Sequence, residues 1–164
     1  MHPWGAEMQS LGVLQNLIDR LPARLQALPS EKVEHKPAPD AWSAKEELGH
    51  LLDSAANNHQ RIVRTQLEEN PAMPGYDGDA WVVLHQYHDR DWHSLIERWS
   101  ALNRQLLAAT EAAPDSAWSR TCTIGDSKPL TLQFVFDDYI HHMLDHLRHM
   151  GAEVDDFARQ ASTP

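Results

Sequence analysis

The chain has 164 residues, 41% of them hydrophobic and 23% charged, which suits one domain with its own apolar core. No run approaches the roughly 20 apolar residues that a membrane span needs, and 14 Lys and Arg against 24 Asp and Glu leave a net charge of −10 that disfavours nucleic-acid binding. The single cysteine, Cys122, excludes an internal disulfide and a cysteine-rich zinc site.

The N-terminal half contains two segments with the apolar periodicity of amphipathic helices. Residues 1–15 lack a basic stretch followed by an apolar one, so no secretory signal is expected and a cytoplasmic location is predicted. The first helix is predicted over residues 8–28, and Pro22 inside it is expected to bend or shorten it. A proline-punctuated loop follows, and "SAKE" then has the pattern of a capping box between Ser43 and Glu46, which predicts a second helix ending near residue 68.

The C-terminal half contains two more helical segments and no strong strand pattern. The third helical region is predicted over residues 80–113, with a break near "HDRD". In the connection that follows, "TCTIGDSKP" is typical of a small hairpin that turns at Gly125-Asp126. The fourth helix is predicted to begin after Thr131 as N-cap and to end at Gly151.

Four helices of this length predict an all-α, up-and-down-like four-helix bundle, in which each helix buries one face. Residues 1–164 are expected to form this single domain, and the polar residues 151–164 are expected to be a partly disordered tail. The role of the histidines of the fourth helix depends on where this bundle places them.

The segment "FDDYIHHMLDHLRHM" places His142, His146 and His149 on a stripe beside the apolar stripe of the fourth helix. Histidines at i and i+4 stack one turn apart and can grip one metal ion. The chain has 11 histidines, so about one such pair is expected by chance, and a solvated histidine-rich face remains the alternative. His141 is predicted to face solvent.

A metal site open to substrate usually has three protein ligands, so a third should come from another helix. On the second helix His50 lies in a polar stripe that borders the apolar face, whereas His59 lies inside that face and is predicted to be a core residue. His85, His88 and His93 flank the expected break in the third helix and are predicted to be surface or packing residues.

The segments "WSAKEELGHLLDSAANNHQRIVR", "PGYDGDAW" and "DYIHHMLDHLRHM" resemble the DinB/YfiT-like superfamily of four-helix-bundle proteins, over residues 42–150. Within it the chain is most similar to the YfiT-type metal-dependent hydrolases, which are grouped with bacillithiol S-transferases. This resemblance implies a divalent ion, nickel or zinc, held by His50, His142 and His146, with His149 left over. It also implies a homodimer and a small-molecule substrate.

Three functions remain open at this point: a metal-dependent thiol S-transferase that uses a low-molecular-weight thiol such as bacillithiol, a metal-dependent hydrolase, and a non-catalytic, stress-related metal-binding or dimerisation module. Asp53, Asn57 and Asp145 are candidates for orienting the histidines, because a ligating histidine usually donates its other N–H to an oxygen. Arg61 is a candidate for holding a carboxylate. The alternative for each is a solvated helix-face residue. Cys122 is not expected to be a nucleophile.

Overall fold

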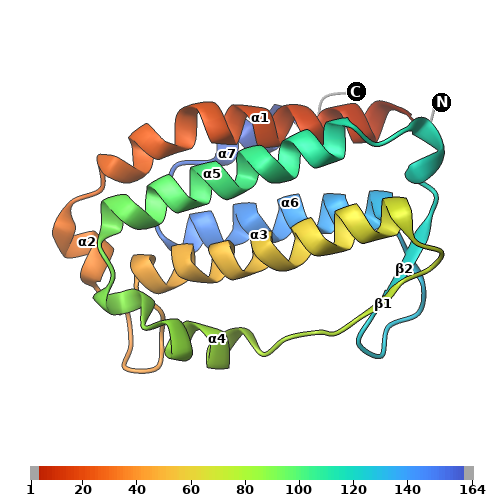
Figure 1. The fold of residues 1–164 in the computed structure, drawn as a ribbon. Coiled ribbons are helices and arrows are strands. Elements are labelled where there is room, and N and C mark those ends of the chain that lie inside the picture. Colours follow the sequence, from red (N-terminus) through yellow and green to blue (C-terminus); the bar gives the residue numbers. More distant parts are fainter. Residues whose placement is uncertain (1–3, 161–164) are drawn as a thin grey trace.

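The computed structural model describes residues 4–160 and contains four long helices (Figure 1). They are α1 (Trp4–Gln26), α3 (Ala44–Leu67), α5 (Trp92–Glu111) and α6 (Leu132–His149). The shorter helical elements are α2 (Ser30–Glu34), α4 (Gly78–His85), α7 (Asp155–Gln160) and the 3-10 turns η1 (Tyr87–Asp89) and η2 (Asp115–Ala117). The strands are β1 (Ala72–Met73), β2 (Thr121–Ile124) and β3 (Leu130–Thr131).

The four long helices form a bundle, in which α3 and α1 each pack against both α5 and α6. The expected all-α, four-helix-bundle class is therefore confirmed. The expected up-and-down order is wrong, because α3 and α5 run in the same direction along the bundle (Figure 1). Residues 68–91 return along its length between them. An extended chain covers about twice the distance per residue that a helix does, so this connection is long enough to run back beside α3.

Local signals set the ends of the two helices that carry the candidate ligands. Ser43 caps α3 and accepts a hydrogen bond from the Glu46 backbone, while the Glu46 carboxylate accepts one from the Ser43 backbone, so the capping box is confirmed. Thr131 caps α6, and Gly151 follows its end with a positive φ of 75°. α1 continues through Pro22 to Gln26, so this proline does not end the helix.

The predicted hairpin is present, and it belongs to a small sheet that the sequence did not predict. β2 pairs with β3 in antiparallel register, and the turn between them contains Gly125 with a φ of 55°. β1, from the returning connection, pairs with β2 in parallel. Cys122, a residue of β2, is fully buried and clusters with Met73 and Val135.

The C-terminal segment differs from the expected loose tail. α7 packs on α1, where Phe157 is fully buried and Asp156 forms ion pairs with Arg20 and Arg24. Both guanidinium groups also lie over the Phe157 ring, and such cation–π contacts stabilise the docked helix. The expectation of disorder is therefore wrong for residues 155–160, and residues 161–164 lie outside the described part of the chain.

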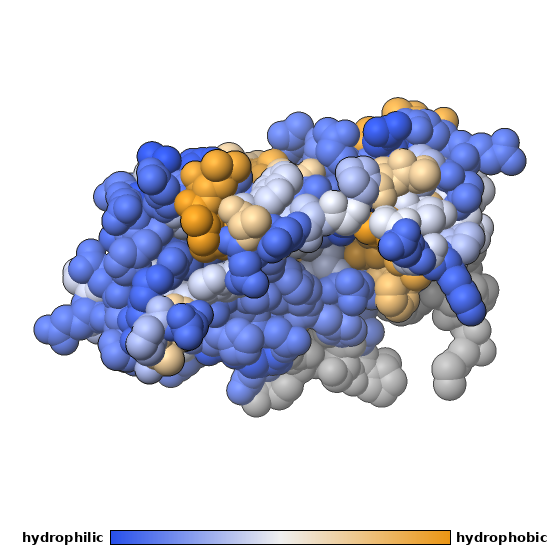
Figure 2. Space-filling model, turned by 90° about the horizontal axis from the view of Figure 1, so that it is seen from below, coloured by the Kyte–Doolittle hydropathy of each residue, from blue (hydrophilic) through white to orange (hydrophobic). Residues whose placement is uncertain are grey.

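The outer face beside α4 is mostly hydrophilic, with separate apolar patches (Figure 2). Among the described residues the exposed large hydrophobic side chains include Val83 and Leu84, both on α4. No helix in the described part of the chain is long and apolar enough to cross a membrane.

Candidate metal centre

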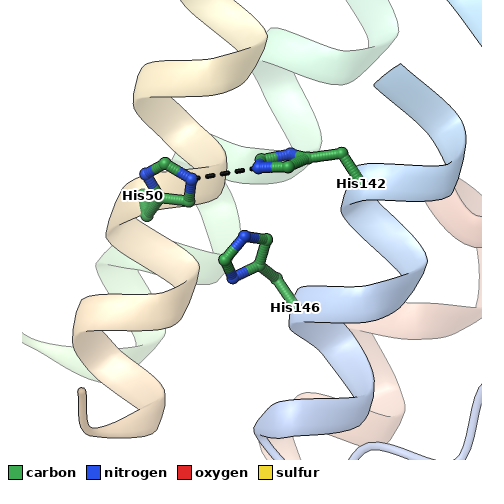
Figure 3. A group of neighbouring side chains, drawn as sticks. All are labelled: His50, His142 and His146. Atoms are coloured by element: carbon green, nitrogen blue, oxygen red, sulfur yellow. Dashed lines mark hydrogen bonds between the residues drawn. The ribbon is translucent and has the colours of Figure 1, made fainter. Parts of the chain in front are cut away.

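Three histidines from two neighbouring helices point their rings toward one another (Figure 3). His50 comes from α3, and His142 and His146 come from consecutive turns of α6. Nε2 of His50 lies 3.1 Å from Nε2 of His142, and one ring nitrogen from each of the three lies within 4.8 Å of the others. The structure therefore brings together the three residues that the sequence singled out as ligands.

The environment of this cluster favours the neutral form of two of its imidazoles, those of His50 and His142. Burial, and then the proximity of His146 and His142, lower the pKa of His50 to about 4. Burial and the nearby His146 also lower the pKa of His142. A neutral imidazole has the free lone pair that a metal ion needs, so both residues are in the ligating form at neutral pH.

The spacing of the cluster suits a divalent ion. Two nitrogens bound to a tetrahedral zinc ion at about 2.0–2.1 Å stand roughly 3.4 Å apart, close to the 3.1 Å between His50 and His142. All three donors are imidazoles, which suit zinc, nickel, copper and iron, whereas magnesium and calcium prefer oxygen ligands. The residues present therefore fit a transition-metal ion.

Glu47 contacts one of the three histidines, His146, at its Nδ1 atom. Its buried carboxylate Oε2 lies 2.5 Å from Nδ1 of His146, which fixes the ring and leaves Nε2 for the cluster. Its other oxygen lies 3.7 Å from Nδ1 of the exposed His149. Carboxylates in this position orient a ligating histidine and raise its basicity. Sequence reasoning missed Glu47, although it precedes His50 by one turn on the same helix.

The returning connection and the segment before α3 cover the cluster with aromatic rings. Trp42 lies with its ring centroid 4.9 Å from that of His50 and 6.0 Å from that of His146. Tyr76 lies 6.4 Å from His50, and a Cβ added at Gly78 would come within 2.9 Å of the His50 ring. A side chain at position 78 would therefore displace His50.

Two hydroxyl groups, of Ser54 and Tyr76, lie beside the cluster. Ser54 Oγ is 3.5 Å from Nδ1 of His142, a long contact at the limit of a hydrogen bond. The same hydroxyl hydrogen bonds with Tyr76, whose pKa is raised by burial and lowered in part by this bond. Tyr76 was not singled out by sequence reasoning, because only the tertiary packing of residues 68–91 brings it here.

The residues predicted to orient the histidines do not contact them. Asp53 instead accepts a hydrogen bond from Tyr87. Asn57 donates to the backbone carbonyl of Asp53 within α3. Asp145 is exposed and pairs with Arg148 at 2.7 Å. The structure thus gives each of the three a hydrogen-bond or ion-pair partner other than the clustered histidines.

Arg61 lies farther along the same face of α3, eleven residues and therefore roughly 16 Å from His50 along the helix axis. Burial lowers the pKa of its guanidinium, while the nearby Tyr76, Cys122 and Asp138 raise it. Its Nη1 lies 3.4 Å from Oδ1 of Asn58. The structure thus places Arg61 beside Tyr76 and away from the three histidines.

The remaining predicted histidines lie outside the cluster. His141 is exposed on α6, and His59, on α3, is half-buried. His88 contacts Ser43, His93 contacts Glu97, and His85 contacts Asp53. The prediction of packing or surface roles agrees with these contacts.

The structure is a four-helix bundle in which three histidines from two helices face one another, an arrangement typical of metal sites. Comparisons with known proteins identify the family to which it belongs. The sequence matches the DinB superfamily over residues 14–152, so the chain belongs to that superfamily. It is 25% identical to YfiT of Bacillus subtilis (strain 168), named as a candidate metal-dependent hydrolase, over 84% of this chain and 78% of that protein. It is 26% identical to BH0277 of Halalkalibacterium halodurans, which has the same description, over 81% and 80% of the two chains.

Two solved structures share the fold. YfiT from Bacillus subtilis, described as having an unusual four-helix bundle topology, matches with a TM-score of 0.71 and 21% identity, over 90% of this chain and 89% of that one. A mutant of the mycothiol-dependent maleylpyruvate isomerase matches with a TM-score of 0.72 and 10% identity, over 90% of this chain and 61% of that one. At these identities the likeness concerns the fold alone.

The lowered pKa of His50 makes the stability of the metal-free protein depend on pH. Below pH 6.5 the unfolded chain binds a proton at His50 that the folded chain does not, because its folded pKa is about 4. The free energy of unfolding should therefore decrease as pH falls from about 6.5 to about 4. Urea titrations of metal-free protein at pH 7 and pH 5 measure this, and His50→Gln should show a smaller decrease. An equal decrease in both proteins would contradict the assignment.

Proposed function

We propose that this protein is a metal-dependent enzyme whose divalent ion is held by His50, His142 and His146. The observation that carries the proposal is the convergence of three imidazoles, one buried and two half-buried, from two helices. The names of the YfiT and BH0277 relatives support a metal-dependent role. Nickel and zinc are the proposed ions, since histidine ligation suits both.

The residues around the proposed ion determine the chemistry that the site supports. Three histidines leave open coordination positions, and Glu47 holds His146 in a fixed orientation. When bound, the ion would supply a Lewis acid that lowers the pKa of a thiol or water at an open position. Trp42 and Tyr76 cover the histidines, which restricts water at the site and strengthens its electrostatic interactions.

The proposed reaction is transfer of a low-molecular-weight thiol, such as bacillithiol, to a small electrophile. Tyr76 and Ser54 lie beside His142 and offer hydroxyl groups for orienting the electrophile, and Arg61 beside Tyr76 offers a cation for a carboxylate. The mycothiol dependence in the description of a structural neighbour motivates testing thiols first. Hydrolysis is the second candidate, because the relatives' names point to it. A homodimer remains a prediction from the family resemblance, and a cytoplasmic location remains a prediction from the sequence.

Removal of the metal tests both proposed reactions, and omission of the thiol distinguishes them. We expect activity toward a chromogenic electrophile with bacillithiol, mycothiol or glutathione to be lost with a chelator and restored by nickel or zinc. Cys122→Ser should retain it, because Cys122, in β2, is fully buried. Metal-dependent product formation without any thiol would favour the hydrolase. Rates that do not change on metal removal would refute both reactions.

A further inference from the structure

A cavity lies on another side of α3, away from the histidine cluster. Its volume is about 480 Å³, within the usual range for small-molecule sites. It is bounded by α3, α4, η1 and α5, whereas the histidines face α6. Its lining residues include Leu52, Asp53, Trp81, Tyr87, Arg98 and Leu102. None of His50, His142 and His146 lines it, so it is a separate feature of the molecule.

A buried carboxylate forms the polar part of this cavity. Asp53 is only 4% exposed, and its Oδ1 accepts a hydrogen bond of 2.7 Å from the Tyr87 hydroxyl. Nδ1 of His85 lies 3.2 Å from the same oxygen. The other oxygen, Oδ2, has no hydrogen-bond partner among the residues that the structure describes. Burial raises the pKa of Asp53, and Tyr87 and His85 lower it in part.

The second oxygen of Asp53 forms no hydrogen bond with the described residues. Tyr87 packs its ring directly over Gly49, where an added Cβ would come within 2.1 Å of that ring, and its hydroxyl is bonded through Oδ1 alone. An ionised carboxylate accepts several hydrogen bonds, and a buried one normally has its oxygens satisfied. Oδ2 therefore lacks a partner of its own, but almost none of its surface is open to the cavity, so a donor in the cavity would reach it after a small movement of the Asp53 side chain.

The other residues that line the cavity indicate the chemistry of the compound that would carry this donor. Leu52 and Leu102 provide apolar walls, and Trp81 adds an aromatic ring that contacts His85 at 5.9 Å between centroids. Arg98, an exposed residue of α5, also lines the cavity and is close enough to lower the pKa values of Asp53 and Tyr87. The cavity thus combines a buried anion, apolar walls and a cation at the exposed side.

We infer that this cavity binds a small amino-acid-like compound, with its ammonium group on Asp53 Oδ2, its apolar part against Trp81 and Leu102, and its carboxylate toward Arg98. An ammonium group supplies the charge-assisted donor that a buried carboxylate favours, and aromatic rings also attract cations. The inference goes beyond the proposed function, because it concerns other residues and does not require the metal.

Three compounds with the same phenylethyl body test this inference: phenylalanine, phenethylamine and 3-phenylpropionate. Titration calorimetry with the full-length, metal-loaded protein should show phenylalanine and phenethylamine binding with a Kd below about 1 mM, and no comparable binding of 3-phenylpropionate. Asp53→Asn, which keeps an acceptor for Tyr87, should weaken the binding of both ammonium compounds roughly tenfold or more. Arg98→Gln should remove the advantage of phenylalanine over phenethylamine.

Asp79→Asn is the matched control, since it makes the same charge change on an exposed residue of α4 and should leave binding unchanged. Circular dichroism of each variant verifies that the helices remain. Equal affinity for 3-phenylpropionate, unchanged affinity in Asp53→Asn, or no binding of either ammonium compound would overturn the inference. Metal content at the histidines is measured separately, so failure here leaves the proposed function standing.

Discussion

Alanine in place of His50, His142 or His146 is expected to lower the affinity for nickel or zinc by more than about 100-fold, because changes to residues that merely orient a ligand already cost 10–100-fold. Each of these residues supplies one of only three nitrogens in the cluster. Metal content of tag-free protein after dialysis, measured by mass spectrometry, should fall to background in each variant. Added nickel should raise the melting temperature of the wild-type protein only, because a ligand that binds the folded state stabilises it.

The controls for this experiment come from the same helices. His141 is exposed on α6 and His59 is half-buried on α3, and neither belongs to the cluster. His141→Ala and His59→Ala should therefore keep full metal content, and far-UV circular dichroism should show that all variants are helical. Equal metal content in all five variants would remove the histidine cluster from the proposed function.

The sequence predicted those parts of the fold that short-range interactions determine. The Ser43–Glu46 capping box and the Thr131 cap involve residues three positions apart, so α3 and α6 were placed within a residue or two. The histidine pair on α6 repeats with the helical period, which made it visible. His50 was visible because a polar residue beside an apolar face needs a partner.

The parts that sequence reasoning missed depend on long-range packing. The Glu47–His146 contact joins residues 99 positions apart, and no local pattern distinguishes Glu47 from an ordinary helix-face acid. The pairing of β1 with β2 and the position of Tyr76 both follow from the path of residues 68–91 along the bundle. α7 was missed because its docking depends on Phe157, a single aromatic residue in a short polar segment.

Asp53 shows how a small rotation changes a prediction. Three residues after His50 on a helix correspond to a rotation of roughly 300°, so the two side chains diverge by about 60°. That difference directs Asp53 toward Tyr87 and the cavity beside α5, while His50 faces α6. A shared polar stripe was therefore insufficient to assign Asp53 to the metal centre.

Glu47→Gln is expected to weaken metal binding about 10–100-fold without unfolding the protein. The amide keeps the size of the side chain but removes the negative charge beside Nδ1 of His146, so the imidazole becomes a poorer donor. Competition with a metal-binding dye measures the affinity. Glu97→Gln is the matched control, because Glu97 lies 3.4 Å from His93 in an exposed glutamate–histidine pair. It should leave the affinity unchanged.

The same variant also distinguishes two ligand sets. Glu47, His146 and His149 have ligand atoms within 4.8 Å of one another and form the alternative group. If the ion is held by the three facing histidines, His149→Ala should keep most of the affinity, because His149 is exposed and lies beside Glu47 and His146 outside that group. If Glu47 were itself a ligand, Glu47→Gln and His149→Ala would both abolish binding while His50→Ala retained it. We expect the first pattern, because His50 is buried, His142 is half-buried and the two lie 3.1 Å apart, whereas the His149 side chain is 63% exposed.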